Sequence, residues 1–159
     1  MKPGAYTQMY VQLVFAVKNR EALLQKDNRP RIFEYMSGIV TSMNHKSIII
    51  NGVSNHTHIL LGLNPKLSVS DTVYEIKRGS SLFINTNCLT QKKFAWQEGY
   101  GSFTYSRSQL NDIYNYILNQ EQHHKKVSFK EEYIDFLKKF EVDYDERFLF
   151  DFLDRKSVV

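Results

Sequence analysis

Two short apolar segments separated by two polar residues constrain the fold of this chain most. Residues 47–53 and 56–63 consist largely of aliphatic and β-branched side chains, and only Ser54 and Asn55 separate them. A two-residue polar connection between such segments is typical of a tight antiparallel hairpin. We therefore expect two paired strands here, and the remaining elements must pack around them.

Strand and helix patterns alternate on both sides of this hairpin. Residues 6–17 are rich in β-branched and aromatic side chains and predict a strand. Residues 30–45 carry apolar side chains at helical spacing, with Asn28 as a candidate cap. Beyond the hairpin, a serine at position 68 or 70 is expected to cap a helix that ends near residue 86. Residues 103–106 then predict a short aromatic strand.

Two helices are expected after this last strand. Ser108 is a candidate cap for a helix that ends near His124, and Ser128 for one that ends near residue 140, with Glu131 at the capping-box position. The order strand, helix, strand, strand, helix, strand predicts an α+β, ferredoxin-like (split βαβ, RRM-like) antiparallel sheet with helices on one face plus C-terminal helices. Folds of this type carry many functions, so function has to be argued from a site.

Length and composition exclude several classes of protein. The chain has 159 residues, which favours one domain over residues 1–159. A single cysteine, Cys88, excludes an internal disulfide, and the sequence has no run of 18 apolar residues and no apolar segment typical of a signal peptide. We therefore expect a cytoplasmic protein that does not span a membrane.

The charge is distributed unevenly along the chain. Residues 1–130 contain 16 Lys and Arg against 8 Asp and Glu, whereas residues 131–155 contain 4 against 9. The sequence thus predicts a basic catalytic body (1–130) and an acidic C-terminal helical tail (131–159). A basic surface favours a polyanionic partner. The tail is either a solvated helix face, the commoner case, or a shield that nucleic acid displaces.

A histidine pair is the first candidate for chemistry. His56 and His58 lie two positions apart in an expected strand, so both side chains point to one face with α-carbons about 7 Å apart. Two imidazoles in this arrangement can share a metal ion. The alternative is a pair of polar residues on a solvated strand face, and a third ligand decides between the two.

A candidate third ligand lies in the helix expected after Ser108. Tyr116 and Gln120 are one turn apart there, while Tyr114 lies about 200° around the helix from Tyr116 and cannot play the same role. Two imidazoles and one amide oxygen leave coordination positions open, which suits Mg²⁺ or Mn²⁺ holding a phosphate. The alternative makes Tyr116 a core-edge aromatic residue and Gln120 a surface residue. We expect His123 and His124 to be exposed near the helix end, and the alternative is that they support the metal site.

Five segments carry a resemblance to a known family: VQLVFAVKNR, GVSNHTHILLGL, SVSDTVYEIKRGSS, FAWQEGYGSFTYS and YILNQEQHHKKVSFKEEY. In this order, over roughly residues 6–133, the chain resembles the single-tyrosine HUH transposases of small bacterial insertion sequences (the insertion-sequence 200/605 type), including the related REP-associated tyrosine transposases. One departure is Thr57, which stands between the histidines where the family has an apolar residue. Its side chain is expected to face away from the histidines and to affect packing before chemistry.

The resemblance implies a mechanism and a set of roles. His56, His58 and Gln120 would bind Mg²⁺ or Mn²⁺, and Tyr116 would be the nucleophile. The implied activity is that of a transposase that cleaves and rejoins single-stranded DNA at hairpin-flanked ends through a covalent 5′-phosphotyrosine. The family's members are homodimers in which a helix of each chain completes the other's site. Two alternatives stay open: a domesticated or inactive relative that binds DNA hairpins without transposition, and an unrelated metal-dependent hydrolase.

Substrate binding is expected to draw on cations and aromatic side chains of the basic body. The candidates for phosphate contacts, each of which could equally be a solvated surface charge, are Lys77, Arg78, Lys92, Lys93 and Arg107. The candidates for stacking on unpaired bases, for which a place in the core or an interface is the commoner role, are Trp96, Tyr100, Phe103 and Tyr105.

Overall fold

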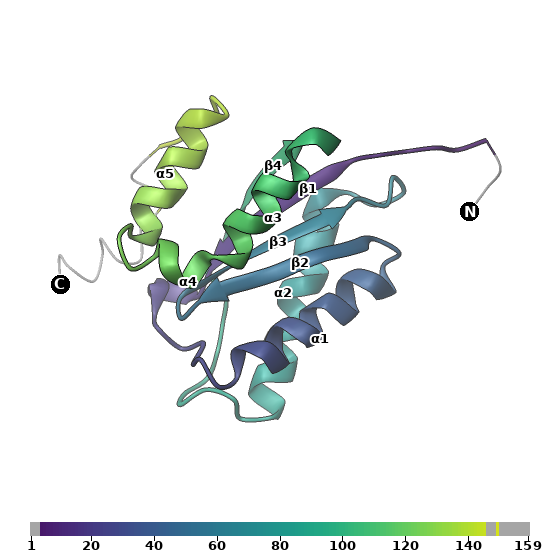
Figure 1. Ribbon diagram of the computed structural model, residues 1–159. Helices are drawn as coiled ribbons and strands as arrows, with labels where there is room; N and C mark the ends of the chain where they lie inside the picture. The colour runs from purple at the N-terminus through teal and green to yellow at the C-terminus, as the bar shows by residue number, and fades with distance from the viewer. Residues whose placement is uncertain (1–3, 146–148, 150–159) are drawn as a thin grey trace.

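A four-stranded antiparallel sheet organises the computed structural model, which describes residues 4–145 and 149. The strands are β1 (Tyr10–Ala16), β2 (Lys46–Val53), β3 (His56–Gly62) and β4 (Gly101–Tyr105), in the spatial order β2-β3-β1-β4 (Figure 1). Every neighbouring pair is antiparallel. With one helix between β1 and β2 and another between β3 and β4, this is the predicted ferredoxin-like, split βαβ arrangement.

The predicted hairpin forms between β2 and β3 and places the first histidine. Val53 pairs with His56 across a turn made by Ser54 and Asn55. Gly52 lies so close to β3 that a Cβ atom there would stand 2.2 Å from the carbonyl oxygen of His56. Only glycine fits this close backbone approach, so the chain is constrained immediately beside His56.

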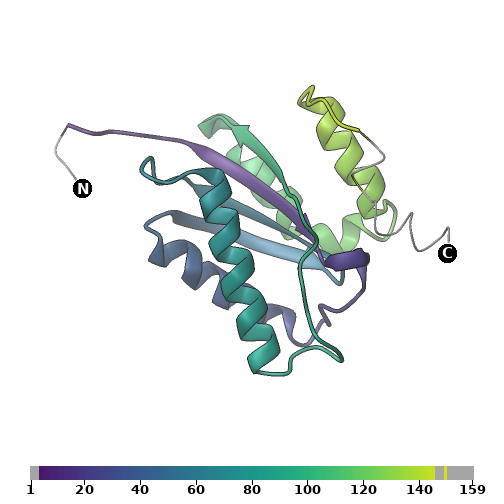
Figure 2. The same ribbon diagram turned by 180° about the vertical axis from the view of Figure 1, so that it is seen from behind.

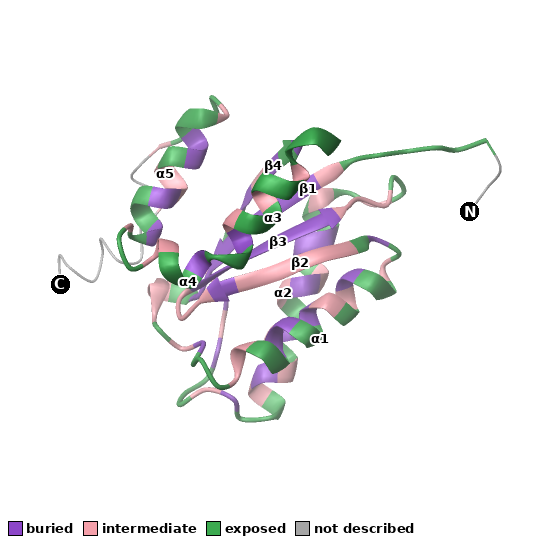
Figure 3. Cartoon of the chain, in the orientation of Figure 1, coloured by how far each residue is buried: buried purple, intermediate pink, exposed green. Residues whose placement is uncertain are grey.

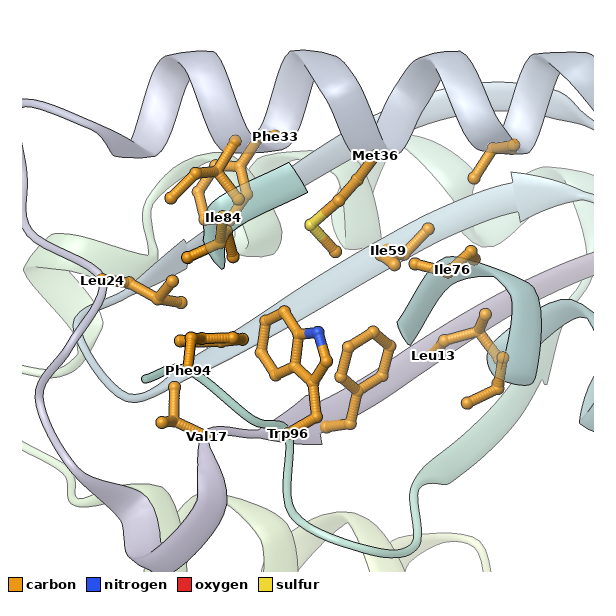
Figure 4. Packing of buried hydrophobic residues seen from close by; sticks show 14 of the residues in the cluster. Leu13, Val17, Leu24, Phe33, Met36, Ile59, Ile76, Ile84, Phe94 and Trp96 are labelled. Carbon is orange, nitrogen blue, oxygen red and sulfur yellow. The ribbon is translucent and has the colours of Figure 1, made fainter. Parts of the chain in front are cut away.

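Helices α1 (Arg29–Ser42) and α2 (Val69–Thr86) pack on one face of the sheet, and Figure 2 shows α2 lying across that face. They bury an apolar cluster that includes Leu13, Met36, Ile59 and Trp96 (Figure 4). As predicted, Ser68 caps α2, where its hydroxyl accepts a 3.0 Å hydrogen bond from the Asp71 amide. We call this side of the sheet the helix-pair face.

The opposite face is covered by the C-terminal helices α3 (Leu110–Leu118), α4 (Gln120–His123) and α5 (Phe129–Lys139) (Figure 1). A second apolar cluster lies here and includes Leu60, Phe103, Ile117 and Phe136. Both faces of β3 are buried, as the burial colours in Figure 3 show. We call this side the C-terminal face.

Several element boundaries differ from the sequence prediction. The first strand begins at Tyr10 rather than at residue 6. Tyr10 pairs with Gly62 and Tyr105, and these are the residues at which β3 and β4 end. Short 3₁₀ turns occupy Lys18–Arg20 and Arg107–Gln109. The second turn has its capping box at Ser106 and Gln109, not at Ser108, since Ser106 has the extended backbone that an N-cap needs.

The helix expected to continue to residue 124 is interrupted at Asn119. Asn119 has φ −96° and ψ 23°, so the chain leaves helical geometry between α3 and α4. By contrast, the capping box predicted at Ser128 and Glu131 is present and starts α5 at Phe129.

The boundary in charge near residue 131 does not coincide with a structural boundary. Helix α5 runs across it, and Phe136 and Leu137 of this helix are buried in the C-terminal cluster together with residues of the sheet. The acidic segment is therefore attached to the body at least as far as residue 139, and its residues 146–148 and 150–159 lie outside the described residues. Among the described helices, none is both long and apolar enough to cross a membrane.

Candidate active site

The two histidines of β3 point to the C-terminal face. His56 and His58 are both 0% exposed, and their ring centroids are 5.3 Å apart. Thr57 alternates with them on β3 and so belongs to the helix-pair side, together with Ile59 and Leu61 of the core there. The alternative of a solvated strand face is therefore wrong, because helices cover both sides of this strand.

Tyr116 and Gln120 reach the histidines from α3 and α4. Asn51 of β2 fixes this segment, since its side-chain amide donates to the Ile117 and Leu118 carbonyl oxygens at 2.9 and 3.0 Å. Gln120 is 0% exposed, with its Oε1 3.4 Å from the His56 Nε2. The Tyr116 ring lies 5.9 Å from that of His58. The four residues singled out in the sequence thus come together within one chain.

A fifth residue, Glu132 of α5, lies at the centre of this group. Its Oε1 is 3.3 Å from the His56 Nε2 and 3.0 Å from the His58 Nε2, and its side chain is buried. The Tyr116 hydroxyl donates to its Oε2, and the Gln120 Nε2 donates to the same oxygen at 3.1 Å. One carboxylate therefore contacts every residue of the predicted site.

Sequence reasoning missed Glu132 because it was counted with the acidic tail. A signal was present in the capping box, which fixes the phase of α5. From Phe129, positions 132 and 136 follow at helical spacing, so Glu132 lies on the apolar stripe between Phe129 and Phe136, and all three are buried. A carboxylate on the buried face of a helix requires partners, and here the partners are the histidines.

His123 and His124 are not exposed, contrary to the sequence prediction. Because the chain turns at Asn119, α4 directs both imidazoles back toward Glu132. The His124 side chain is only 9% exposed, with its Nε2 3.1 Å from the Glu132 Oε1. The Nε2 of His123 is 3.3 Å from the Tyr116 hydroxyl.

Burial and mutual contacts shift the pKa values of this group. Burial lowers the pKa of His56 to about 4, so this imidazole is neutral at pH 7. Burial, reinforced by the charge of Glu132, raises the pKa of the Tyr116 phenol above its usual value. Burial alone would raise the pKa of Glu132, but the electrostatic effect of His58 and the hydrogen bond that His58 donates outweigh it and hold that pKa below its ordinary range.

The hydrogen bonds of the Nδ1 atoms indicate which ring nitrogen carries the proton. The Nδ1 of His56 donates to the Asn55 Oδ1 at 2.8 Å, and the Nδ1 of His124 donates to the Val127 carbonyl oxygen at 2.7 Å. With Nδ1 as the donor, a ring that is neutral presents its Nε2 lone pair to the carboxylate of Glu132. An Nε2 lone pair and a carboxylate oxygen are both electron-rich, so they repel each other unless a cation lies between them.

This donor set fits a divalent cation. One ligand atom from each of His56, His58, His124 and Glu132 lies within 4.8 Å of all the others, and the Gln120 oxygen borders the same space. Imidazole nitrogen with carboxylate and amide oxygen is a mixed set of the kind that Mn²⁺ and related ions accept. An open pocket of about 360 Å³, lined in part by Tyr116, Glu132 and Lys139, leads to this cluster from the surface.

The proposed phosphate-binding cations differ in how free they are. The Lys77 ammonium is half-buried and donates to the Gln97 and Gly99 carbonyl oxygens at 2.8 and 2.7 Å, so it fastens a loop. Arg78 pairs with Glu75 and Lys92 with Glu21. The remaining two candidates, Lys93 and Arg107, are exposed.

Three of the four aromatic candidates for base stacking belong to the cores. Trp96 is buried on the helix-pair face and donates from its Nε1 to the Ser80 hydroxyl at 2.9 Å. Phe103 and Tyr105 are buried on the C-terminal face. Tyr100 alone of the four is exposed, with 37% of its surface accessible.

The chain matches one protein family over most of its length. Residues 5–120 match the family described as "Transposase IS200 like", so the chain belongs to the IS200-like transposases. A search of curated proteins finds no match.

Two solved structures share the fold. A candidate transposase from Deinococcus radiodurans aligns with a TM-score of 0.59 and 23% identity over 76% of this chain and 96% of that one. A REP-associated tyrosine transposase bound to a REP hairpin aligns with a TM-score of 0.58 and 14% identity over 80% of this chain and 76% of that one. At these identities the likeness concerns the fold.

Proposed function

We propose that this chain is a DNA strand transferase that cleaves and rejoins single-stranded DNA at hairpin-flanked ends through a covalent 5′-phosphotyrosine, with a divalent metal. The observation that carries the proposal is the convergence of His56, His58, Gln120 and Tyr116 on one buried carboxylate. Membership of the transposase family supports DNA as the substrate, and the relative that is bound to a REP hairpin supports a hairpin ligand.

Tyr116 is the proposed nucleophile. Its oxygen would attack the scissile phosphorus, a bond would form between the two, and the bond to the 3′ oxygen would break to leave a free 3′-hydroxyl. The hydroxyl proton already points to the Glu132 Oε2, which is the nearest acceptor for it. Since the phosphotyrosine keeps the energy of the phosphodiester, attack by another 3′-hydroxyl rejoins the strands without ATP.

The metal ligands we propose are His56, His58 and the oxygen of Gln120, and the structure adds His124 and Glu132 as candidates. When bound, Mg²⁺ or Mn²⁺ would neutralise charge on the phosphoryl oxygens. The protein's own part is to hold the imidazoles rigid, which it does by burying both β3 histidines completely. It also keeps Tyr116 within reach through the Asn51 contacts to α3.

Lys93 and Arg107 remain the freest of the proposed DNA contacts, and Arg78 and Lys92 would have to exchange their carboxylate partners for phosphate. A homodimer with exchanged tyrosine helices also remains a proposal. Within one chain Tyr116 already contacts its own site, so exchange is not needed to assemble the residues. The expected place of action is the cytoplasm.

The decisive experiment uses labelled single-stranded hairpin DNA and Mn²⁺. Wild-type protein should form a protein–DNA adduct that survives denaturant, and Tyr116→Phe should form none. Tyr114→Phe is the matched control, because this tyrosine lies two residues away on the same helix and is exposed. Adduct formation by Tyr116→Phe, or an adduct that persists in EDTA, would contradict the assigned roles.

A second candidate function is favoured by the position of Glu132. Its carboxylate lies against Tyr116 and the histidines, where a scissile phosphate would have to approach, and two anions repel. A relative that binds DNA hairpins without transposition would show this arrangement. Tight hairpin binding with no adduct from wild-type protein, across several hairpins, would support this second function over the first.

A further inference from the structure

Three of the four imidazoles around Glu132, those of His56, His58 and His124, are not held alike. His56 and His124 donate from Nδ1 to an oxygen, so in a neutral ring the lone pair is on the inward-facing Nε2. The Nδ1 of His58 instead accepts a 2.8 Å hydrogen bond from the Gln12 Nε2. A neutral His58 with an acceptor at Nδ1 carries its proton at Nε2, and that Nε2 donates to the Glu132 Oε1 at 3.0 Å.

Gln12 is also hydrogen-bonded at its other end. Gln12 lies on β1 beside β3 and is 0% exposed. Its Oε1 accepts a 2.6 Å hydrogen bond from the Tyr105 hydroxyl of β4, and its amide nitrogen faces His58. Tyr105, Gln12 and His58 thus form a buried chain of hydrogen bonds across three strands of the sheet.

This chain is incompatible with metal binding by His58 as it stands. An imidazole coordinates a metal through an unprotonated nitrogen, and the Nε2 of His58 is the atom that faces the cluster. For that nitrogen to lose its proton in a neutral ring, the proton must reside on Nδ1, where an acceptor is needed. Gln12 can supply one by turning its amide so that Oε1 faces His58, because the Tyr105 hydroxyl is able to accept as well as to donate.

We propose that Gln12 is a positioning residue that sets which ring nitrogen of His58 carries the proton, and that its amide turns its oxygen toward His58 when the site holds a metal. The inference rests on the proposed metal-dependent function, and it concerns a residue that touches neither DNA nor metal. It also explains a glutamine that is entirely buried, with both of its polar groups engaged.

Two substitutions separate positioning from packing. Gln12→Met keeps the length of the side chain and removes both hydrogen bonds, so His58 loses its orientation. Gln12→Glu offers only acceptors and fixes the proton of His58 on Nδ1, the form that binds metal. Thr72→Val is the control, because it removes a buried 2.9 Å hydrogen bond to His45, a histidine on the helix-pair side of the sheet.

The experiment records ¹⁵N NMR spectra of the histidine rings without metal, and Mn²⁺ affinity by EPR. We expect His58 protonated at Nε2 in wild-type protein and at Nδ1 in Gln12→Glu. Mn²⁺ affinity should fall about 10–100-fold in Gln12→Met, which is the usual effect of losing such a partner, and should be retained in Gln12→Glu and Thr72→Val. Circular dichroism confirms that each variant is folded.

The possible failures are distinguishable. If the wild type binds Mn²⁺, His58→Ala does not, and Gln12→Met binds as the wild type does, then the inference is overturned and the proposed function stands. If His58 already carries its proton at Nδ1 in the metal-free wild type, the inference is equally overturned. A folded wild type that binds no Mn²⁺ contradicts the proposed function and the inference with it.

Discussion

The two faces of the sheet use the same strands for different purposes. On β3, Thr57, Ile59 and Leu61 lie on the helix-pair side, and the cluster there is built from aliphatic and aromatic side chains. On the other side of the same strand, His56 and His58 meet Glu132. One face provides stability that does not depend on ionisation, and it thereby supports the buried polar groups on the other, which are costly to desolvate.

The largest expected effect tests the C-terminal face. His58→Ala removes an inward-facing imidazole and should reduce strand cleavage at least ~10³-fold, because charge neutralisation by a metal contributes several kcal/mol to the transition state. Addition of EDTA to wild-type protein should have a similar effect, and a gel assay of labelled hairpin DNA measures both.

The control for this prediction is the buried histidine on the other side. The Nε2 of His45 donates to the Thr72 hydroxyl and its Nδ1 accepts from the Asn64 amide, so its role is structural. His45→Gln keeps a hydrogen-bonding amide and should cleave at the wild-type rate. Equal losses in the two variants would mean that the faces do not differ in function.

The next effect tests the helix-pair face. Ile59 is 0% exposed, and Ile59→Ala should lower the free energy of unfolding by about 2–5 kcal/mol through lost contacts and a cavity. Mn²⁺ affinity should stay unchanged at a temperature where the variant is folded. Urea denaturation and EPR titration measure the two quantities, and a large loss of affinity would show that the faces are coupled.

A smaller effect is the loss of folding stability at acidic pH. The pKa of His56 is about 4 in the folded chain against 6.5 for an unperturbed histidine, so the unfolded chain binds more protons between these values. The contribution of neutral His56 to the free energy of unfolding is fully present above about pH 6.5 and is lost as the pH falls toward 4. Metal-free protein should therefore lose about 2 kcal/mol between pH 7 and pH 5 from this group.

Urea denaturation in EDTA at the two pH values measures this loss, and His56→Gln should show less of it, since glutamine does not titrate. Below about pH 4.5, protonation of Glu132 adds to the loss, because its pKa is also lowered in the fold. If the wild type and His56→Gln lose equal stability between pH 7 and pH 5, His56 is not buried in its neutral form.

The smallest effect concerns Thr57, the residue that departs from the family pattern. Its hydroxyl donates to the Asn51 carbonyl oxygen at 3.2 Å, away from the histidines. Thr57→Val should change stability by less than about 1 kcal/mol, the contribution of one such hydrogen bond. Cleavage should be unchanged, and a marked gain in cleavage rate would indicate that Thr57 acts on the site.

Local patterns predicted the parts of the site that lie within one element. The two-residue period of a strand placed His56 and His58 on one face, and the helical period placed Tyr116 near Gln120, even though Asn119 breaks the helix between α3 and α4. The capping box at Ser128 likewise fixed the start of α5. These relations depend only on backbone geometry.

Contacts between distant segments could not be predicted in the same way. Glu132 meets His58 across 74 residues of sequence, and its position depends on how α5 folds back over the sheet. Charge counting placed Glu132 in the acidic tail, although its carboxylate is buried at the centre of the site. Gln12 was likewise one polar residue in an apolar strand until its partners on β3 and β4 were seen.

The most direct test of the account is the location of the metal in crystals soaked with Mn²⁺, seen by anomalous scattering. The account predicts one strong peak on the C-terminal face, within bonding distance of the Nε2 atoms of His56 and His58. The amide of Gln12 should then direct its oxygen to the Nδ1 of His58. An empty cluster at saturating Mn²⁺, in protein that still forms the covalent adduct with DNA, would contradict the account.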